Sequence, residues 1–96
     1  MTPEFHPAAE AELTAAVQLY EERVAGLGRD LSAETKRVAA VLCATPRIGE
    51  PLDDLHRRFP MKRFPFALIY RVDGDRLRIV AVGHRRRLPG YWRLRS

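Results

Sequence analysis

The sequence has only one cysteine and no long hydrophobic run, and both absences narrow the possible functions. A single cysteine excludes an internal disulfide and cannot build a zinc site alone. Cys43 lies in the apolar stretch Val41–Ala44, which favours a small buried residue over a nucleophile. No stretch approaches the roughly 20 apolar residues that a membrane-spanning helix needs, and the first residues lack the basic-then-apolar order of a signal peptide. These features predict a cytoplasmic protein.

Metal-ligating residues are also scarce. His6 and His56 have no carboxylate or cysteine at ligand spacing, so we expect no metal site and no cofactor. Both histidines are interpreted as cap and loop residues, and the neighbouring acids Asp53 and Asp54 as a solvated turn. A chain of 96 residues with 46% hydrophobic residues is expected to form a single domain over residues 1–96.

Charge is unevenly distributed along the chain, whose formal net charge is +5. Residues 1–55 contain ten acidic and five basic residues, for a net charge of −5. Residues 56–96 contain twelve basic and two acidic residues, for a net charge of +10, and eleven of these bases are arginine. Arginine suits planar anion recognition, so the basic half is expected to face an anionic partner. The alternative is an ordinary solvated surface.

Helical periodicity dominates the first half of the chain. Apolar residues at helical spacing predict a helix from Ala8 to Gly26, preceded by Pro7 at a favourable first position. A second helix is predicted from about Arg29 to Ala44, with one face formed by Leu31, Thr35, Val38 and Leu42. The short break between them predicts an antiparallel helical hairpin.

Strand signals follow in the second half. Phe5 is placed on a brief first strand, residues 46–54 in a loop and residues 55–59 on a short strand. Stronger strands are predicted over Phe64–Val72 and Arg76–His84, joined by a hairpin turn at Asp73–Gly74. Helices followed by antiparallel strands predict a two-layer α+β domain, in which an antiparallel β-sheet is covered on one face by the N-terminal α-helical hairpin.

The last thirteen residues carry the main functional signal: His84-Arg85-Arg86-Arg87-Leu88-Pro89-Gly90-Tyr91-Trp92-Arg93-Leu94-Arg95-Ser96. Arginine forks pair with phosphate or carboxylate groups. Arg85 is the best candidate for an anion contact. At most two of Arg85, Arg86 and Arg87 are expected to converge, because neighbours on an extended chain point in opposite directions.

The other candidate residues keep alternative roles. His84 is either a general acid or base or a hydrogen-bonded strand-end residue. Tyr91 stacks on a base or donates a proton, or else closes the sheet edge. Trp92 is expected to anchor the tail on the core or on a partner. Lys62 and Arg63, in a loop flanked by prolines, either extend the basic surface or are solvated.

Taken together, the order of elements and motifs resembles the ParE/RelE superfamily of bacterial type II toxin–antitoxin toxins. The matching segments span nearly the whole chain: Phe5-His6-Pro7-Ala8-Ala9-Glu10-Ala11-Glu12-Leu13, Tyr20-Glu21-Glu22, Gly26-Leu27-Gly28, Pro46-Arg47-Ile48-Gly49, residues 64–72 and residues 82–92. The resemblance implies a β-α-α-β-β-β fold, and a toxin neutralised by a cognate antitoxin that wraps an extended and helical segment around it. We expect that segment to be acidic and partly disordered, and a toxin–antitoxin hetero-oligomer to form.

The resemblance leaves the target open between two branches. RelE-like members cut mRNA in the ribosome, whereas ParE-like members poison DNA gyrase. The RelE-like arginine of the middle strand falls on Ala67 here, which offers neither charge nor proton. Two other RelE-like positions are filled, by Arg85 and Tyr91, and with His84 these would form the catalytic set of a nuclease. The tail resembles the ParE-like branch more closely, so a gyrase inhibitor, not an enzyme, is expected. The alternatives are a ribosome-dependent endoribonuclease and a non-catalytic nucleic-acid-binding module.

Overall fold

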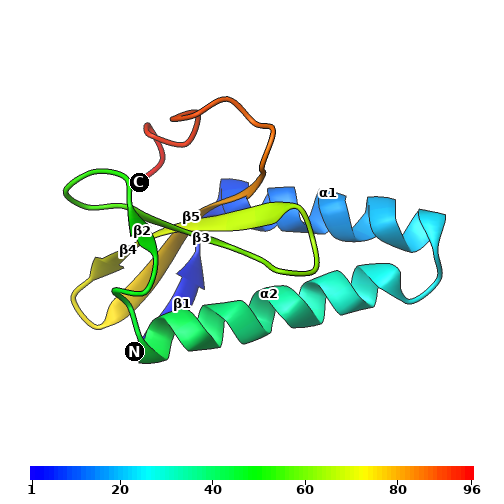
Figure 1. Ribbon diagram of the computed structural model, residues 1–96, viewed down its shortest axis with the longest axis horizontal. Coiled ribbons are helices and arrows are strands. Elements are labelled where there is room, and N and C mark those ends of the chain that lie inside the picture. The colour runs from blue at the N-terminus through cyan, green and yellow to red at the C-terminus, as the bar shows by residue number, and fades with distance from the viewer.

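Two helices and five strands make up the structure, a computed structural model that describes residues 1–96 (Figure 1). In chain order the elements are β1 (Thr2–Phe5), α1 (Pro7–Arg23), α2 (Leu27–Ala44), β2 (Glu50–Pro51), β3 (Arg57–Pro60), β4 (Phe66–Asp73) and β5 (Arg76–His84). The strands form one sheet in the order β1-β5-β4-β3-β2. The α+β class and the N-terminal helical hairpin predicted from the sequence are confirmed.

Helix α1 begins one residue before its predicted start and ends three residues before its predicted end. Pro7 occupies its first turn, where the missing N–H costs nothing. The Nδ1 of His6 accepts a hydrogen bond from the backbone N–H of Ala8 at 3.0 Å, so His6 caps the helix. Val24, inside the predicted helix, is 57% exposed because the helix has already ended at Arg23.

Helix α2 begins at Leu27, two residues before its predicted start. The Glu21 carboxylate accepts hydrogen bonds from the backbone N–H groups of Gly26 (2.7 Å) and Gly28 (3.0 Å), which supplies a cap from the preceding helix. The predicted inner face of α2 is confirmed, since all four of its residues are buried: Leu31, Thr35, Val38 and Leu42. Neither helix combines the length and apolar character required to span a membrane.

The prediction of a purely antiparallel sheet is wrong at one edge. Strand β1 pairs parallel with β5, with Thr2 opposite Arg76 and Phe5 opposite Ile79, so the sheet is mixed. Parallel neighbours need a long crossover connection, and here the helical hairpin lies between the two strands in the chain. A further difference is β2, a two-residue strand that pairs antiparallel with β3 inside the segment predicted as a loop.

The central hairpin agrees with the prediction except at its ends. Strand β4 begins at Phe66 rather than Phe64, because Pro65 has no N–H to give to the ladder. Asp73 is still paired with Arg76, so the turn consists of Gly74 and Asp75. Gly74 has φ +61°, in the left-handed region that glycine adopts without strain.

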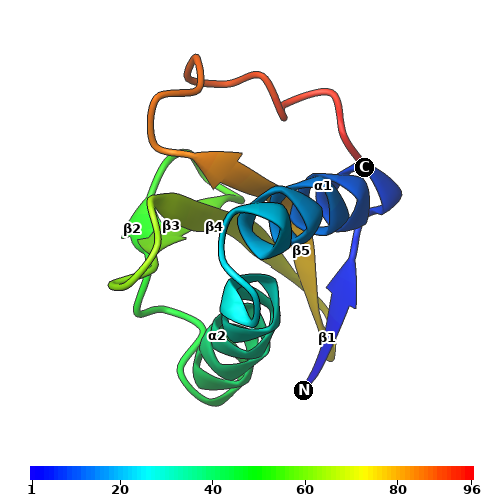
Figure 2. The ribbon, with the colours of Figure 1, turned by 90° about the vertical axis from the view of Figure 1, so that its right-hand side faces the viewer.

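Both faces of the sheet are covered. On one face, the helices pack on Leu68, Tyr70, Leu77 and Ile79, which are all fully buried. Cys43 is half-buried against this core, and burial raises the pKa of its thiol, as expected for a packing residue. On the other face lies the tail after β5. Figure 2 shows this tail and α2 on opposite sides of the sheet. The site described next is on the tail side.

Candidate functional site

Trp92 fixes the tail to the sheet. Its side chain is only 3% exposed and packs with three residues of the central hairpin, Ile69, Val80 and Ala81. The ring of His56 lies 4.6 Å from the Trp92 ring, centroid to centroid. Trp92 is therefore an anchor that docks the tail onto its own core, and it is not available as a platform for a base.

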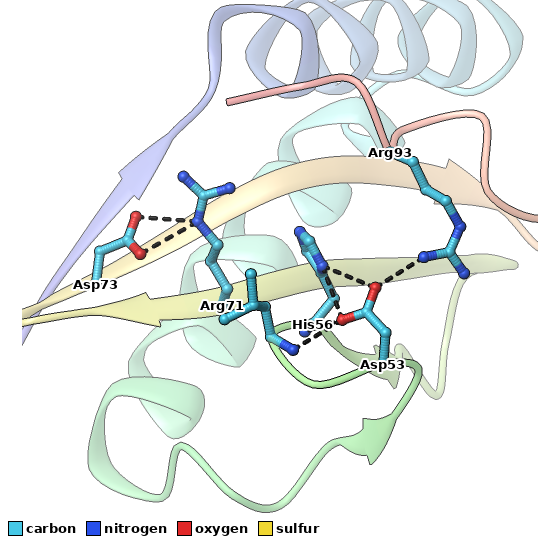
Figure 3. A network of polar contacts seen from close by, with 6 residues as sticks. Asp53, His56, Arg71, Asp73 and Arg93 are labelled. Carbon is cyan, nitrogen blue, oxygen red and sulfur yellow. Dashed lines mark hydrogen bonds and ion pairs between the residues drawn. The ribbon is translucent and has the colours of Figure 1, made fainter.

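A second attachment of the tail is Asp53, shown in Figure 3 between His56 and Arg93. One carboxylate oxygen accepts hydrogen bonds from the backbone N–H groups of Leu55 (2.8 Å) and His56 (2.7 Å), and the other accepts one from Nη1 of Arg93 at 2.7 Å. The His56 Nδ1 lies 3.0 Å from the same carboxylate. The two backbone N–H groups, helped by His56 and Arg93, hold the pKa of Asp53 well below its ordinary value.

Asp53 lies in an exposed bend and His56 in the loop before β3, as the sequence predicted. The structure adds that Asp53 binds the tail and that the His56 side chain is buried. The signal that was available is local. Aspartate often accepts hydrogen bonds from the N–H groups two and three residues later, as Asp53 does here. The partner, Arg93, could not be inferred from that pattern.

Glu12 of α1 makes the third attachment. Its carboxylate pairs with the Arg95 guanidinium at 2.8 and 3.1 Å and with Nη1 of Arg87 at 3.5 Å. It also accepts a hydrogen bond from the backbone N–H of Val82 at 3.0 Å, while Arg95 donates to the carbonyl of Val80 at 3.0 Å. The hydrogen bond to Glu12 raises the pKa of Arg95. Neither the role of Glu12 nor that of Arg95 could be inferred from the sequence.

Tyr91 is half-buried beside two arginines of the tail. The guanidinium groups of Arg87 and Arg95 lie 4.0 and 5.1 Å from its ring centroid. Its hydroxyl is buried without a hydrogen-bond partner, and burial, together with the negative charge of Glu12, raises the pKa of Tyr91 to about 12. Arg93 covers Trp92 in a similar way at 4.7 Å. The tail aromatics are therefore paired with the protein's own cations.

A cavity of about 280 Å³ separates the tail from the sheet. Its lining includes the small residues Ala67 and Gly83, which are paired across β4 and β5, together with the apolar Leu52, Ile69 and Leu88. Four arginines and His84 also line it, and no acidic residue does. The position that would carry an arginine in a RelE-like toxin is thus part of the wall of an open cavity.

Only two of the four arginines in this wall are unpaired. Arg87 is bound to Glu12 and Arg93 to Asp53, whereas the guanidinium groups of Arg58 and Arg85 make no ion pair or hydrogen bond. Both also line an adjoining recess at the start of β4 that includes Lys62 and Arg63. Arg58, on β3, was not among the residues singled out in the sequence.

The consecutive arginines therefore have different environments. Arg85 lines the cavity, Arg86 is exposed outside it, and Arg87 is held by Glu12. The Nδ1 of His84, the last residue of β5, accepts a hydrogen bond from the backbone N–H of Arg86 at 3.1 Å, so His84 is a hydrogen-bonded residue at the strand end. Arg63 pairs with Asp30 of α2 at 3.0 Å, and Lys62 is exposed without an ion pair. No three His, Cys, Asp or Glu residues cluster in a way that could hold a metal ion.

The elements form an α+β fold with a helical hairpin on one face of the sheet and a basic tail on the other. This arrangement is the RelE/ParE-like fold. The family model described as "ParE toxin of type II toxin-antitoxin system, parDE" matches residues 4–89. The chain belongs to this ParE toxin family.

A solved structure supports the same fold. A chain of the "Chromosomal ParDE TA system from P. aeruginosa" superimposes with a TM-score of 0.70 at 21% sequence identity, covering 88% of this chain and 95% of that one. No curated protein matches the sequence. The residues that attach the tail, Trp92, Arg93 and Arg95, lie beyond the segment that the family model matches.

Proposed function

We propose that this chain is the toxin of a type II toxin–antitoxin system, that it inhibits DNA gyrase by binding it, and that a cognate antitoxin neutralises it. Membership of the ParE toxin family supports the toxin role, and the resemblance of the tail to ParE-like toxins implies gyrase as the target. The observation that carries the choice of target is the open cavity at Ala67, where a nuclease of this superfamily would place a cation.

The remaining residues of the cavity also favour binding over RNA cleavage. Cleavage through the ribose 2′-hydroxyl needs a proton acceptor, a proton donor and cations for the transition state. Tyr91 is a poor proton donor, because its hydroxyl is buried and its pKa is raised to about 12. Arg85 supplies a cation, whereas Arg87 lies over the Tyr91 ring and 3.5 Å from the Glu12 carboxylate. The residues that remain in the cavity wall therefore suit the binding of a protein partner.

The antitoxin is proposed from the same family membership and from charge. The unpaired cations Arg58, Lys62 and Arg85 line the cavity and the adjoining recess at the start of β4. An acidic segment that folds on contact would be attracted to this surface and would be oriented by it.

The test is a supercoiling assay with purified gyrase and the purified chain at micromolar concentration. We expect loss of supercoiling and accumulation of cleaved DNA, with a DNA-damage response in cells where the chain is induced. Unchanged gyrase activity together with translation arrest and new mRNA ends would instead assign the chain to the ribosome. Binding of naked DNA or RNA that weakens steeply with salt, with neither of those effects, would identify a nucleic-acid-binding module.

A further inference from the structure

The cavity between the tail and the sheet has a charge that the protein itself leaves uncompensated. The arginines that hold the tail are each paired with an acid, Arg87 and Arg95 with Glu12 and Arg93 with Asp53. Arg58 and Arg85 approach the same cavity from β3 and from the turn after β5, and neither has an acidic partner. Arg58 is half-buried and Arg85 is exposed at the mouth of the cavity, and two neighbouring cations without an acidic partner favour an anionic group supplied from outside.

The rest of the lining restricts what can carry that anionic group. The Trp92 ring is only 3% exposed, and the Arg87 guanidinium lies 4.0 Å from the centroid of the Tyr91 ring, so the wall offers little aromatic surface on which a nucleobase could stack. The cavity of about 280 Å³ is at the lower end of the roughly 300–1,000 Å³ of pockets for drug-sized ligands and cofactors. A cavity of this size accommodates an amino-acid side chain.

Apolar groups form the other part of the wall. Ala67, Ile69 and Leu52 line the cavity, and Leu88 stands beside it with 78% of its surface exposed. Apolar side chains this exposed at the mouth of a cavity are typical of a protein-interaction site. An apolar side chain next to a carboxylate therefore matches both parts of the wall.

We propose that this cavity is the anchor point for an acidic peptide segment, with one apolar side chain inserted over Ala67 and a neighbouring Asp or Glu carboxylate bound by Arg58 and Arg85. This deepens the proposed function and rests on it, because the partner that would present such a segment is the antitoxin. The cavity exists because Ala67 and Gly83 are small. A larger side chain at position 67 would fill the space that the inserted residue needs.

The test is a titration of the ¹⁵N-labelled full chain, followed by NMR. The probes are acetyl-Asp-Leu-Asp-amide, its neutral match acetyl-Asn-Leu-Asn-amide, and inorganic phosphate. We expect the acidic peptide to shift the backbone amides of Ala67 and Gly83 and the Nε–H signals of Arg58 and Arg85, and to bind at least tenfold more tightly than the neutral peptide.

Matched variants separate recognition from general charge. Arg85→Gln should weaken the acidic peptide about tenfold, whereas Arg86→Gln, which removes the same charge outside the cavity, should change binding less than twofold. Ala67→Leu should abolish the shifts while both arginines remain. Equal binding of the two peptides, equal loss in Arg85→Gln and Arg86→Gln, or shifts confined to other residues would each overturn the proposal.

Three further outcomes show which of the two proposals fails. Tighter binding of phosphate than of the acidic peptide at the same amides would overturn the peptide assignment in favour of a phosphate site. A chain that inhibits gyrase but shows no peptide-dependent shifts would overturn the anchor alone. Peptide binding at the cavity by a chain without effect on gyrase would support the anchor and reject the proposed target.

Discussion

Glu12 and Arg95 form a two-point ion pair across the molecule. Nη1 of Arg95 lies 2.8 Å from Oε1 of Glu12, and Nη2 lies 3.1 Å from Oε2. The pair joins the first helix to the end of the tail, 83 residues later in the chain. The side chains are only 15% and 17% exposed, so solvent screens the attraction weakly. The same carboxylate binds the backbone of β5 through Val82, which connects helix, sheet and tail in one cluster.

Replacement of Glu12 by glutamine should release the tail. The change leaves Arg95 largely buried without a counter-ion, and breaking a buried pair in this way costs about 3 kcal/mol of unfolding free energy. Urea denaturation measures the loss, and hydrogen exchange of the Val82 amide reports whether its own bond to Glu12 is lost. The matched control is Glu34→Gln, which breaks the pair with the 59%-exposed Arg37 and should cost less than about 0.5 kcal/mol. Equal losses in the two variants would mean that Glu12 does not hold the tail.

The sequence predicted elements well where local periodicity decides them. The buried face of α2, from Leu31 to Leu42, and strand β5 follow from spacing alone, because the helical and strand periods are set by the backbone. The parallel pairing of β1 could not be inferred, since it depends on where the helical hairpin returns the chain. The attachments of the tail could not be predicted for a similar reason. Nothing local to Glu12 or Asp53 indicates an arginine 83 or 40 residues later.

The candidate site was predicted in part. Arg85 was singled out by its place after the last strand, and it does line the cavity without a partner. Arg58 was missed because an arginine on a short strand resembles any solvated charge. What distinguishes Arg58 is the absence of an acid beside it, and that depends on which acids the fold has used elsewhere.

Acid should loosen the tail through Asp53. The pKa of this carboxyl is lower in the folded protein than in the unfolded chain, mainly because two backbone N–H groups bind the charged form. Its contribution to stability is therefore fully present above the unfolded pKa of about 3.9 and is lost as the pH falls toward the folded value. Urea denaturation from pH 7 to pH 2 should show this loss below about pH 4. Asp53→Asn should remove that part of the dependence, and an unchanged pH profile in this variant would contradict the assignment.

Removing the hydroxyl of Tyr70 should lower the unfolding free energy, whereas removing that of Tyr91 should not. The Tyr70 hydroxyl donates to the carbonyl of Pro46 at 2.7 Å and accepts from the N–H of Gly49 at 3.0 Å, whereas the buried Tyr91 hydroxyl has no partner. Tyr70→Phe should lower the unfolding free energy by about 1–2 kcal/mol, because two backbone groups lose their partner. Tyr91→Phe should be neutral or stabilising by up to about 1 kcal/mol. A comparable loss in Tyr91→Phe would show that its hydroxyl is bonded in solution.

The close approach of Gly83 and Tyr91 offers a coupled test of the tail position. A Cβ at position 83 would lie 2.2 Å from the Tyr91 hydroxyl oxygen but 3.2 Å from the ring carbon that bears it. Gly83→Ala should therefore push Tyr91 away and cost about 1–3 kcal/mol, as overpacking does. Removing the hydroxyl relieves most of the clash, so Gly83→Ala combined with Tyr91→Phe should be more stable than Gly83→Ala alone by about 1 kcal/mol or more. The coupling energy from the double-mutant cycle in urea measures this contact directly. Additive effects would place Tyr91 away from β5, and with it the tail that forms the cavity wall.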